Sequence, residues 1–200
     1  MRACGSDADA TARRCRGPRT DAARNRARIL AVAQEMFVEQ GLKVSLDEIA
    51  RRAGIGNATL YRHFPGRHAL LVEALERIAV TGAEAAEEAA AQEDDPYTAL
   101  SCFAQAVARE RLAALCCLSD ELAKECPELA RQTDRLTHAA QRLLTRAQQA
   151  KQVRADVSLE EFLVAITQLS RPLPGASWSA TDRFSPRILQ LYLDGLFISV

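Results

Sequence analysis

Residues 45–71 read SLDEIARRAGIGNATLYRHFPGRHALL and predict two short helices, a glycine-bearing turn between them, and the start of a third helix. Ser45 and Glu48 have the spacing of a capping box, in which the Ser hydroxyl accepts a backbone N–H and the Glu side chain reaches back to the cap. The apolar residues that follow at i, i+3, i+4 and i+7 share one buried face of the first helix: Leu46, Ile49, Ala50 and Ala53.

The second short helix is expected over residues 57–64. Gly54 suits the positive φ that a tight stop requires, and the cap of the next helix is expected to come from Asn57 or, because Gly56 has no side chain, from bare backbone. Leu60 and Phe64 then share the inner face. A short helix with small and hydrogen-bonding side chains at its N-terminal end fits the major groove of DNA, about 12 Å wide. The stretch therefore predicts a helix-turn-helix that reads DNA.

These residues resemble the DNA-binding segment of tetracycline-repressor-type (TetR family) regulators, over roughly the first third of the chain. The resemblance rests on Ala53-Gly54, the run Leu60-Tyr61-Arg62-His63-Phe64, Arg67 and the pair Leu70-Leu71. It implies an all-α fold with an N-terminal three-helix DNA-binding domain followed by a helical ligand-binding and dimerisation domain. It further implies a ligand-responsive transcriptional regulator, a repressor that releases its operator when a small molecule binds the C-terminal domain.

Two residues depart from the family pattern. Gly56 stands where Ser or Thr is common, and Ala58 stands where Gly is common. Both lie in the base-reading part, so the resemblance does not extend to the operator sequence.

The candidate DNA contacts divide into positioning and reading residues. We expect phosphate contacts from Ser45, Tyr61, His63 and Arg67, and base-edge contacts from Asn57, Thr59 and Arg62, with Ala58 against a thymine methyl group. The alternative for Tyr61 and His63 is helix packing.

The charge distribution supports a nucleic-acid partner. The 200-residue chain has a formal net charge of zero, but residues 1–68 hold 13 Arg or Lys and 7 Asp or Glu, a balance of +6, and the remainder balances at −6. A basic N-terminal third suits phosphates, whereas an acidic body does not. Arg-rich solvated surface is the alternative, and it does not explain the asymmetry.

The chain is predicted to comprise a disordered basic arm over residues 1–19, a helix-turn-helix domain over 20–66 and a helical domain over 67–200. The first helix is expected from Thr20-Asp21 to Gly41, and a long linker helix is expected to reach about Gln92. Further helices are expected over residues 97–110, 112–124 and 127–152, then after the Ser158 cap, and after a loop over 171–182.

The last two helices are apolar around more than one face, which predicts a homodimer on a palindromic operator, with intrachain core as the alternative. The expected interface residues are Phe162, Leu163, Ile166, Ile188, Leu189, Tyr192 and Leu196. A pocket for an unknown small-molecule effector is expected among Phe103, Val107, Cys116, Cys117, Leu122, Leu136 and Trp178, although apolar residues at helical spacing also form cores.

Other classes of function have weaker support. Six cysteines without a CxxC pair leave open a redox-responsive regulator or a metal site near His138, although free cysteines are commonly buried. No cofactor and no metal are expected. The sequence contains no GxSxG motif, no HExxH motif and no phosphate loop, so it does not point to an enzyme. A protein-binding helical scaffold would leave the basic N-terminal third unexplained. Without a membrane-length apolar run or a signal peptide, a cytoplasmic protein is expected.

Overall fold

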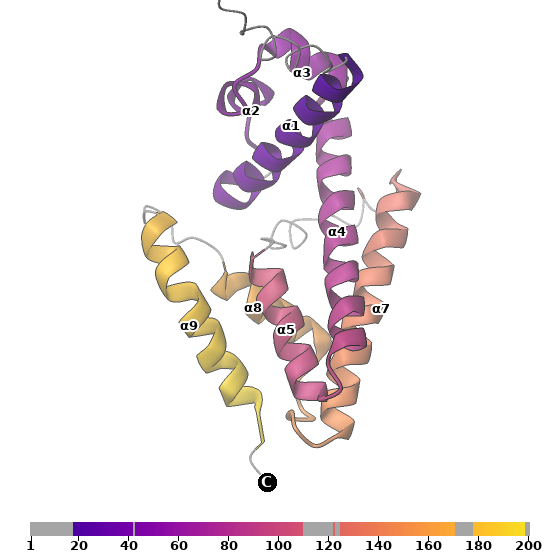
Figure 1. The fold of residues 1–200 in the computed structure, drawn as a ribbon, viewed down its shortest axis with the longest axis vertical. Helices are drawn as coiled ribbons and strands as arrows, with labels where there is room; N and C mark the ends of the chain where they lie inside the picture. Colours follow the sequence, from indigo (N-terminus) through magenta and orange to yellow (C-terminus); the bar gives the residue numbers. More distant parts are fainter. Residues whose placement is uncertain (1–17, 42, 110–121, 123–124, 171–177, 199–200) are drawn as a thin grey trace, which may run out of the picture.

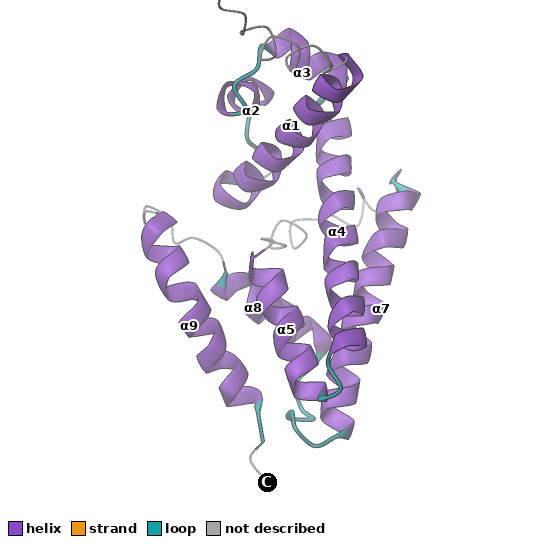
Figure 2. Ribbon diagram, viewed as in Figure 1, coloured by secondary structure: helices purple, strands orange, loops and turns teal. Residues whose placement is uncertain are grey.

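The computed structural model describes residues 18–41, 43–109, 122, 125–170 and 178–198, with the side chains of 18–21, 38 and 178–184 excepted. Its helices are α1 (Pro18–Gln40), α2 (Leu46–Arg52), α3 (Asn57–His63), α4 (Arg67–Gln92), α5 (Pro96–Arg109), α7 (Pro127–Gln149), α8 (Leu159–Leu169) and α9 (Trp178–Leu196) (Figure 1). The described part of the chain contains no strand (Figure 2). The all-α prediction is confirmed.

Several helix ends differ from the sequence expectation. Helix α1 begins at Pro18, so residues 18 and 19 belong to a helix and not to the expected arm; the fixed φ of proline suits the first helical position. Helix α9 begins at Trp178, inside the expected loop. The expected helix over residues 112–124 lies outside the described residues apart from Leu122.

Helix α7 ends at Gln149, before the expected Gln152. Lys151 adopts a positive φ of 58°, the Lys151 N–H donates to the Gln148 carbonyl at 3.0 Å, and the Gln152 N–H donates to the Ala147 carbonyl at 3.0 Å. These two bonds satisfy carbonyls at the helix end and turn the chain toward α8. The Ser158–Glu161 capping box then opens α8 with both of its bonds formed.

Helices α1, α2 and α3 enclose a small apolar core that fixes the N-terminal unit. Ile29, Phe37, Ile49 and Leu60 are all buried there. Gly54 takes a φ of +63° in the turn between α2 and α3, and the Ile55 N–H donates to the Ala50 carbonyl at 3.0 Å. The expected positive φ at Gly54 is therefore confirmed, and it sets the angle between α2 and α3.

Helix α4 connects this unit to the rest of the chain. It begins at Arg67 beside α1 and α3 and continues into the body, where it packs along α7 and α5 (Figure 1). Small buried side chains on α4, among them Ala79, Ala83 and Ala86, allow the close approach of α7. The N-terminal unit and the body are therefore joined through one continuous helix.

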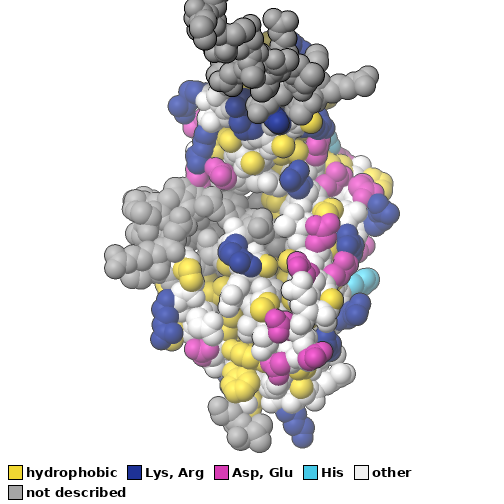
Figure 3. Space-filling model, in the orientation of Figure 1, with side chains coloured by type: hydrophobic (Ala, Val, Ile, Leu, Met, Phe, Trp, Pro, Cys, Tyr) yellow, Lys and Arg dark blue, Asp and Glu magenta, His cyan; other side chains and the backbone are white. Residues whose placement is uncertain are grey.

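The surface carries mixed charge. On the face shown in Figure 3, Lys and Arg side chains surround the helices of the N-terminal unit, and Asp and Glu side chains are numerous along the body. Within the described residues, no helix has both the length and the apolar character needed to span a bilayer.

Candidate nucleic-acid interface

Helix α2 begins with the expected cap. Ser45 has an extended backbone, and its Oγ accepts a hydrogen bond from the Glu48 N–H at 3.1 Å. Only this half of the predicted capping box is present among the described contacts, because the Glu48 carboxylate lies 3.7 Å from the Arg51 guanidinium instead. The exposed Ser45 hydroxyl keeps its own proton, which it can donate to a phosphate oxygen.

The cap of α3 is formed by backbone alone. Gly56 is the N-cap, with φ −74° and ψ 148°, and it caps without a side chain. Asn57 is the first helical residue, so its amide is released from capping and Nδ2 donates to Oδ1 of Asp47 on α2 at 2.8 Å. Of the two caps that the sequence left open, the structure has bare backbone at Gly56 and not the Asn57 side chain, because Gly56 already supplies the extended backbone that a cap needs.

One side of α3 is open to solvent. Asn57, Ala58, Tyr61 and Arg62 are exposed, with Tyr61 at 49%. Ala58, Tyr61 and Arg62 point away from Leu60, which is fully buried, and Asn57 is exposed at the first turn of the helix. This face presents amide, methyl, phenol and guanidinium groups together, which suits the edges of bases and the flanking phosphates.

Three of the predicted contact residues are partly withdrawn from solvent. Thr59 and His63 are half-buried, and so is Arg67. The Arg67 guanidinium donates from Nη1 to the carbonyl of Val44, which ties the first turn of α4 to the segment before α2. Arginine has five N–H donors, so this bond leaves others for a phosphate, and the phosphate contact stays a prediction.

Arg26 is the residue at this interface that the sequence did not reveal. From α1, its Nε donates to Glu73 Oε1 at 2.9 Å and its Nη2 donates to the other carboxylate oxygen. Its Nη1 donates to the carbonyl of His63 at 2.7 Å, and the guanidinium lies 4.4 Å from the centre of the Phe64 ring. One side chain therefore connects α1, the end of α3 and α4.

Comparison with known families agrees with this geometry. Residues 29–74 match the model for bacterial regulatory proteins of the tetR family. Residues 95–198, more than half of the chain, match the model for the C-terminal domain of SbtR-like transcriptional regulators. This chain belongs to the TetR family. It is a transcriptional regulator with a helix-turn-helix DNA-binding unit, and its family and fold are not those of enzymes.

Curated relatives match about a third of this TetR-family chain. HTH-type transcriptional regulators of Staphylococcus aureus are 42% identical over 60 residues, which is 30% of this chain and 32% of theirs. The chain thus spans about a third of the length of the curated relatives that it matches.

Solved structures match nearly all of it. A TetR regulator from Mycobacterium vanbaalenii is 34% identical and a TetR regulator from Streptomyces coelicolor is 27% identical. The matches cover 90% and 88% of this chain and 99% of each of those chains, with TM-scores of 0.56 and 0.58. The regulator LfrR from Mycobacterium smegmatis, solved in complex with proflavine, has a TM-score of 0.64 at 20% identity over 89% of this chain and 98% of its own, and so shares the fold.

The candidate effector pocket of this TetR-family protein stays a prediction, because only four of its seven side chains are described. Phe103, Val107 and Leu136 are buried in the core, and Leu122 is half-buried. Cys116 and Cys117 lie outside the described residues, as does the side chain of Trp178. Two cavities lined by described residues lie elsewhere, between α4 and α7.

The predicted dimer residues separate into two groups. Phe162, Ile166, Leu189 and Leu196 are buried within the chain itself, and Leu163 and Tyr192 are half-buried. Ile188 is 45% exposed, and two residues that the prediction omitted, Val164 and Leu191, are 47% and 54% exposed. Both sides of α8 and α9 are apolar, so only the packing against α5 shows which side remains open.

The described cysteines do not favour redox chemistry. Cys102 is half-buried on α5, and Cys126 Sγ lies 3.8 Å from His68 Nε2. Burial raises the pKa of the Cys126 thiol, and the carboxylates of Glu125 and Glu76 raise it further. A raised pKa disfavours the reactive thiolate. The described part of the chain contains no group of three or more His, Cys, Asp or Glu side chains placed to hold a metal ion.

Proposed function

We propose that this TetR-family protein is a homodimeric repressor that binds a palindromic operator and releases it when a small molecule binds the C-terminal domain. The observation that carries the proposal is the single helix α4, which begins within the DNA-binding unit and runs through the body. A shift of α4 within the body therefore also moves the DNA-binding unit. Because the target is DNA, we expect the protein to act in the bacterial cytoplasm.

The start of α4 is held to the DNA-binding unit by polar contacts as well as by packing. Glu73 binds Arg26, Arg67 binds the Val44 carbonyl, and Gln34 Nε2 donates to the Ala74 carbonyl at 3.1 Å. These contacts join α4 to α1 and to the connection before α2. They support a unit that turns with α4 as one body, since each contact would have to break for α4 to move alone.

The exposed face of α8 and α9 supports the homodimer. Val164, Ile188 and Leu191 are large apolar side chains, each close to half exposed. Pairing two copies through this face removes apolar surface from water and provides two reading helices. Paired helix-turn-helix units bind half-sites about 34 to 36 Å apart, or multiples of that distance, so we expect a palindromic operator.

The effector site is proposed within the body, among the candidate residues given above. The family supports ligand binding there, and the LfrR structure holds proflavine. The energetic requirement is modest. An effector that prefers the DNA-incompetent state by about 2.7 kcal/mol weakens operator binding about 100-fold.

A selection from random double-stranded DNA tests the DNA-binding part of the proposal. We expect recovery of one palindrome, and light scattering should give the mass of a dimer in the absence of DNA. Recovery of no sequence would instead favour a protein-binding scaffold. In vitro transcription from a promoter that carries the palindrome should then fall as the protein is added, whereas a rise would identify an activator.

A thermal-shift screen tests the ligand response. Small molecules that raise the melting temperature of the free protein are titrated against the protein–operator complex. By linkage, an effector that prefers the DNA-incompetent state must weaken operator binding by the same factor by which the operator weakens its own binding. If every stabilising molecule leaves operator affinity unchanged, the protein is not ligand-responsive in the proposed way.

A further inference from the structure

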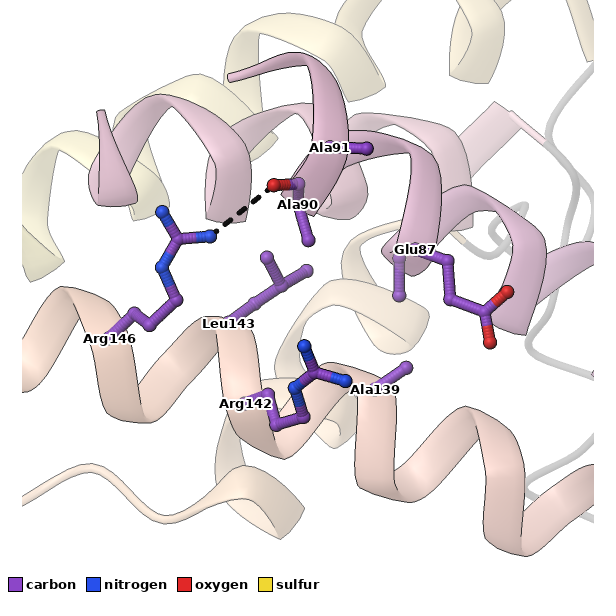
Figure 4. Close-up of a pocket in the computed structure, with 8 residues that line it drawn as sticks. Glu87, Ala90, Ala91, Ala139, Arg142, Leu143 and Arg146 are labelled. Atoms are coloured by element: carbon purple, nitrogen blue, oxygen red, sulfur yellow. Dashed lines mark hydrogen bonds between the residues drawn. The ribbon is translucent and has the colours of Figure 1, made fainter. Parts of the chain in front are cut away.

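A groove on the outer side of the body lies between α4 and α7, with a volume of about 310 Å³. Its floor is made of small or compact apolar side chains, Ala86 and Ala90 from α4 and Ala139 and Leu143 from α7. Arg142 and Arg146 stand at its edge. In Figure 4 both guanidinium groups extend from α7 toward α4, one on each side of Leu143.

The two arginines belong to a basic stripe on α7. Cationic or titratable side chains recur at intervals of three or four residues along one face of the helix: Arg131, Arg135, His138, Arg142 and Arg146. The first arginines of the stripe have carboxylate partners. Arg131 binds Glu128 at 2.7 Å, and Arg135 binds Glu87 on α4 through two bonds of 2.8 and 2.5 Å.

The carboxylates of α4 end before the stripe does. After Glu87 and Glu88, α4 continues as Ala89, Ala90, Ala91 and Gln92, so this stretch offers no carboxylate to α7. Glu88 itself accepts a hydrogen bond from Gln92 at 2.8 Å. Arg146 therefore faces alanines, and Arg142 shares the groove with the carboxylate of Glu87, which is already paired with Arg135.

The two guanidinium groups at the groove therefore make few short contacts within the described residues. Arg146 makes two long contacts of 3.5 Å, to the carbonyls of Ala90 and Asp94. Arg142 makes no hydrogen bond or ion pair with any described residue. Its charge acts on Glu87 at longer range. The hydrogen bond and charge of Arg135 lower the pKa of Glu87, and the charge of Arg142 lowers this pKa a little further.

We propose that this groove binds a small amphipathic organic anion, a carboxylate or sulfonate with a flat apolar body. The anionic head lies between Arg142 and Arg146, because guanidinium groups bind such heads through paired N–H donors. The apolar body lies on Ala90, Ala91 and Ala139, whose short side chains let a flat ring approach both helices. The volume is at the lower end of the range for ligand pockets, about 300 to 1,000 Å³, and so selects a small ligand.

The proposed site is separate from the interior effector residues, none of which lines it. Binding there does not depend on operator release, so the two proposals can fail independently. A bare inorganic anion would leave the alanine floor without a contact, and an uncharged ring would offer no negative charge to the two guanidinium groups. Head and body together therefore define the ligand class.

Isothermal titration calorimetry on the full chain without DNA tests the site. The probe is 1-naphthoate, and 1-naphthalenemethanol and inorganic phosphate are the comparison probes. We expect 1-naphthoate to bind at least about tenfold more tightly than either. No detectable binding of 1-naphthoate, or equal binding of the uncharged alcohol or of phosphate, would overturn the proposal.

Variants locate the binding. Arg142→Gln and Arg146→Gln should each weaken 1-naphthoate binding about tenfold, and Ala90→Leu should weaken it by filling the groove. Arg131→Gln, on the same face of α7 but paired with Glu128, is the matched control and should leave the dissociation constant within about twofold. Arg142 has no described partner to lose, so this variant should keep the melting temperature of the parent. Unchanged 1-naphthoate binding in Arg142→Gln would place the probe elsewhere and refute the site.

Discussion

The guanidinium of Arg26 on α1 binds the carboxylate of Glu73 on α4 through both oxygens, with Nε 2.9 Å from Oε1. The two residues are 47 positions apart in the sequence. Because the same guanidinium also binds the His63 carbonyl, the end of the reading helix and the start of α4 share one partner.

This relationship predicts that Arg26 contributes to the stability of the DNA-binding unit. Arg26→Ala removes the ion pair, the bond to His63 and the contact with the Phe64 ring, so we expect a loss of about 2 kcal/mol of unfolding free energy. Urea denaturation measures it. Arg28→Ala, an exposed neighbour on α1 with one 3.2 Å bond to Asn25, is the control and should change stability by less than about 0.5 kcal/mol. Equal losses in the two variants would contradict the role given to Arg26.

The exposed amide of Asn57 predicts a change of sequence preference. Its Nδ2 is held by Asp47, which leaves Oδ1 and a second N–H available to a base. Asn57→Ala should therefore relax discrimination by about 1 to 3 kcal/mol at the base that it contacts. Arg67→Ala should weaken binding to all DNA sequences alike. It should also reduce by about 1 the steepness with which the logarithm of the binding constant falls with the logarithm of the salt concentration. Titration of single-base operator variants distinguishes the two, and the reverse assignment of effects would show that reading and positioning residues were interchanged.

Two leucines on α9 separate the dimer interface from the core. Leu191 is 54% exposed and Leu189 is 3% exposed. Leu191→Arg should give a folded monomer, because it places a charge in the proposed interface. Leu189→Arg should instead lower the melting temperature strongly, since a buried charge without a partner is costly. Light scattering and circular dichroism measure both. A folded Leu191→Arg dimer would move the interface to another face.

Glu76 predicts a pH-dependent contribution to stability. Burial raises the pKa of Glu76 above its usual 4.5, and the charges of Glu128 and Glu73 raise it further. The folded protein therefore holds this proton more tightly than the unfolded chain. The stability contributed by protonated Glu76 is fully present below the unfolded pKa and is lost as the pH rises through the folded pKa.

Replacing the ionised form should consequently stabilise the protein at neutral pH. Glu76→Gln is expected to add less than about 1 kcal/mol at pH 7, because the site is partly solvated and water screens the repulsion. The gain should disappear near pH 4, where the parent side chain is itself protonated. Thermal melts of both proteins across this range provide the comparison, and a gain that grows as the pH falls would have the wrong sign.

The helix-turn-helix was predictable because the residues that determine it are close together in the sequence. Ser45 caps α2, Gly54 makes the turn, and Leu60 is buried, as the short-range pattern indicated. The sequence left two caps open for α3, the Asn57 side chain and bare backbone, and only the structure shows that Gly56 is the cap while the Asn57 amide binds Asp47. The effector residues could not be placed by pattern, because an apolar residue at helical spacing suits a core as well as a pocket.

The sequence by itself determined the all-α fold, the long helix α4 and a basic N-terminal third. It also determined the helix-turn-helix, with the Ser45 cap and the turn at Gly54. Backbone hydrogen bonding and the 3.6-residue period act over a few neighbours, so adjacent residues suffice to specify them. Only the tertiary structure decided that Arg26 joins α3 to α4, that Leu191 is open while Leu189 is buried, and that Arg142 and Arg146 stand over alanines. Those facts depend on which faces of distant helices meet, and that choice is made by packing.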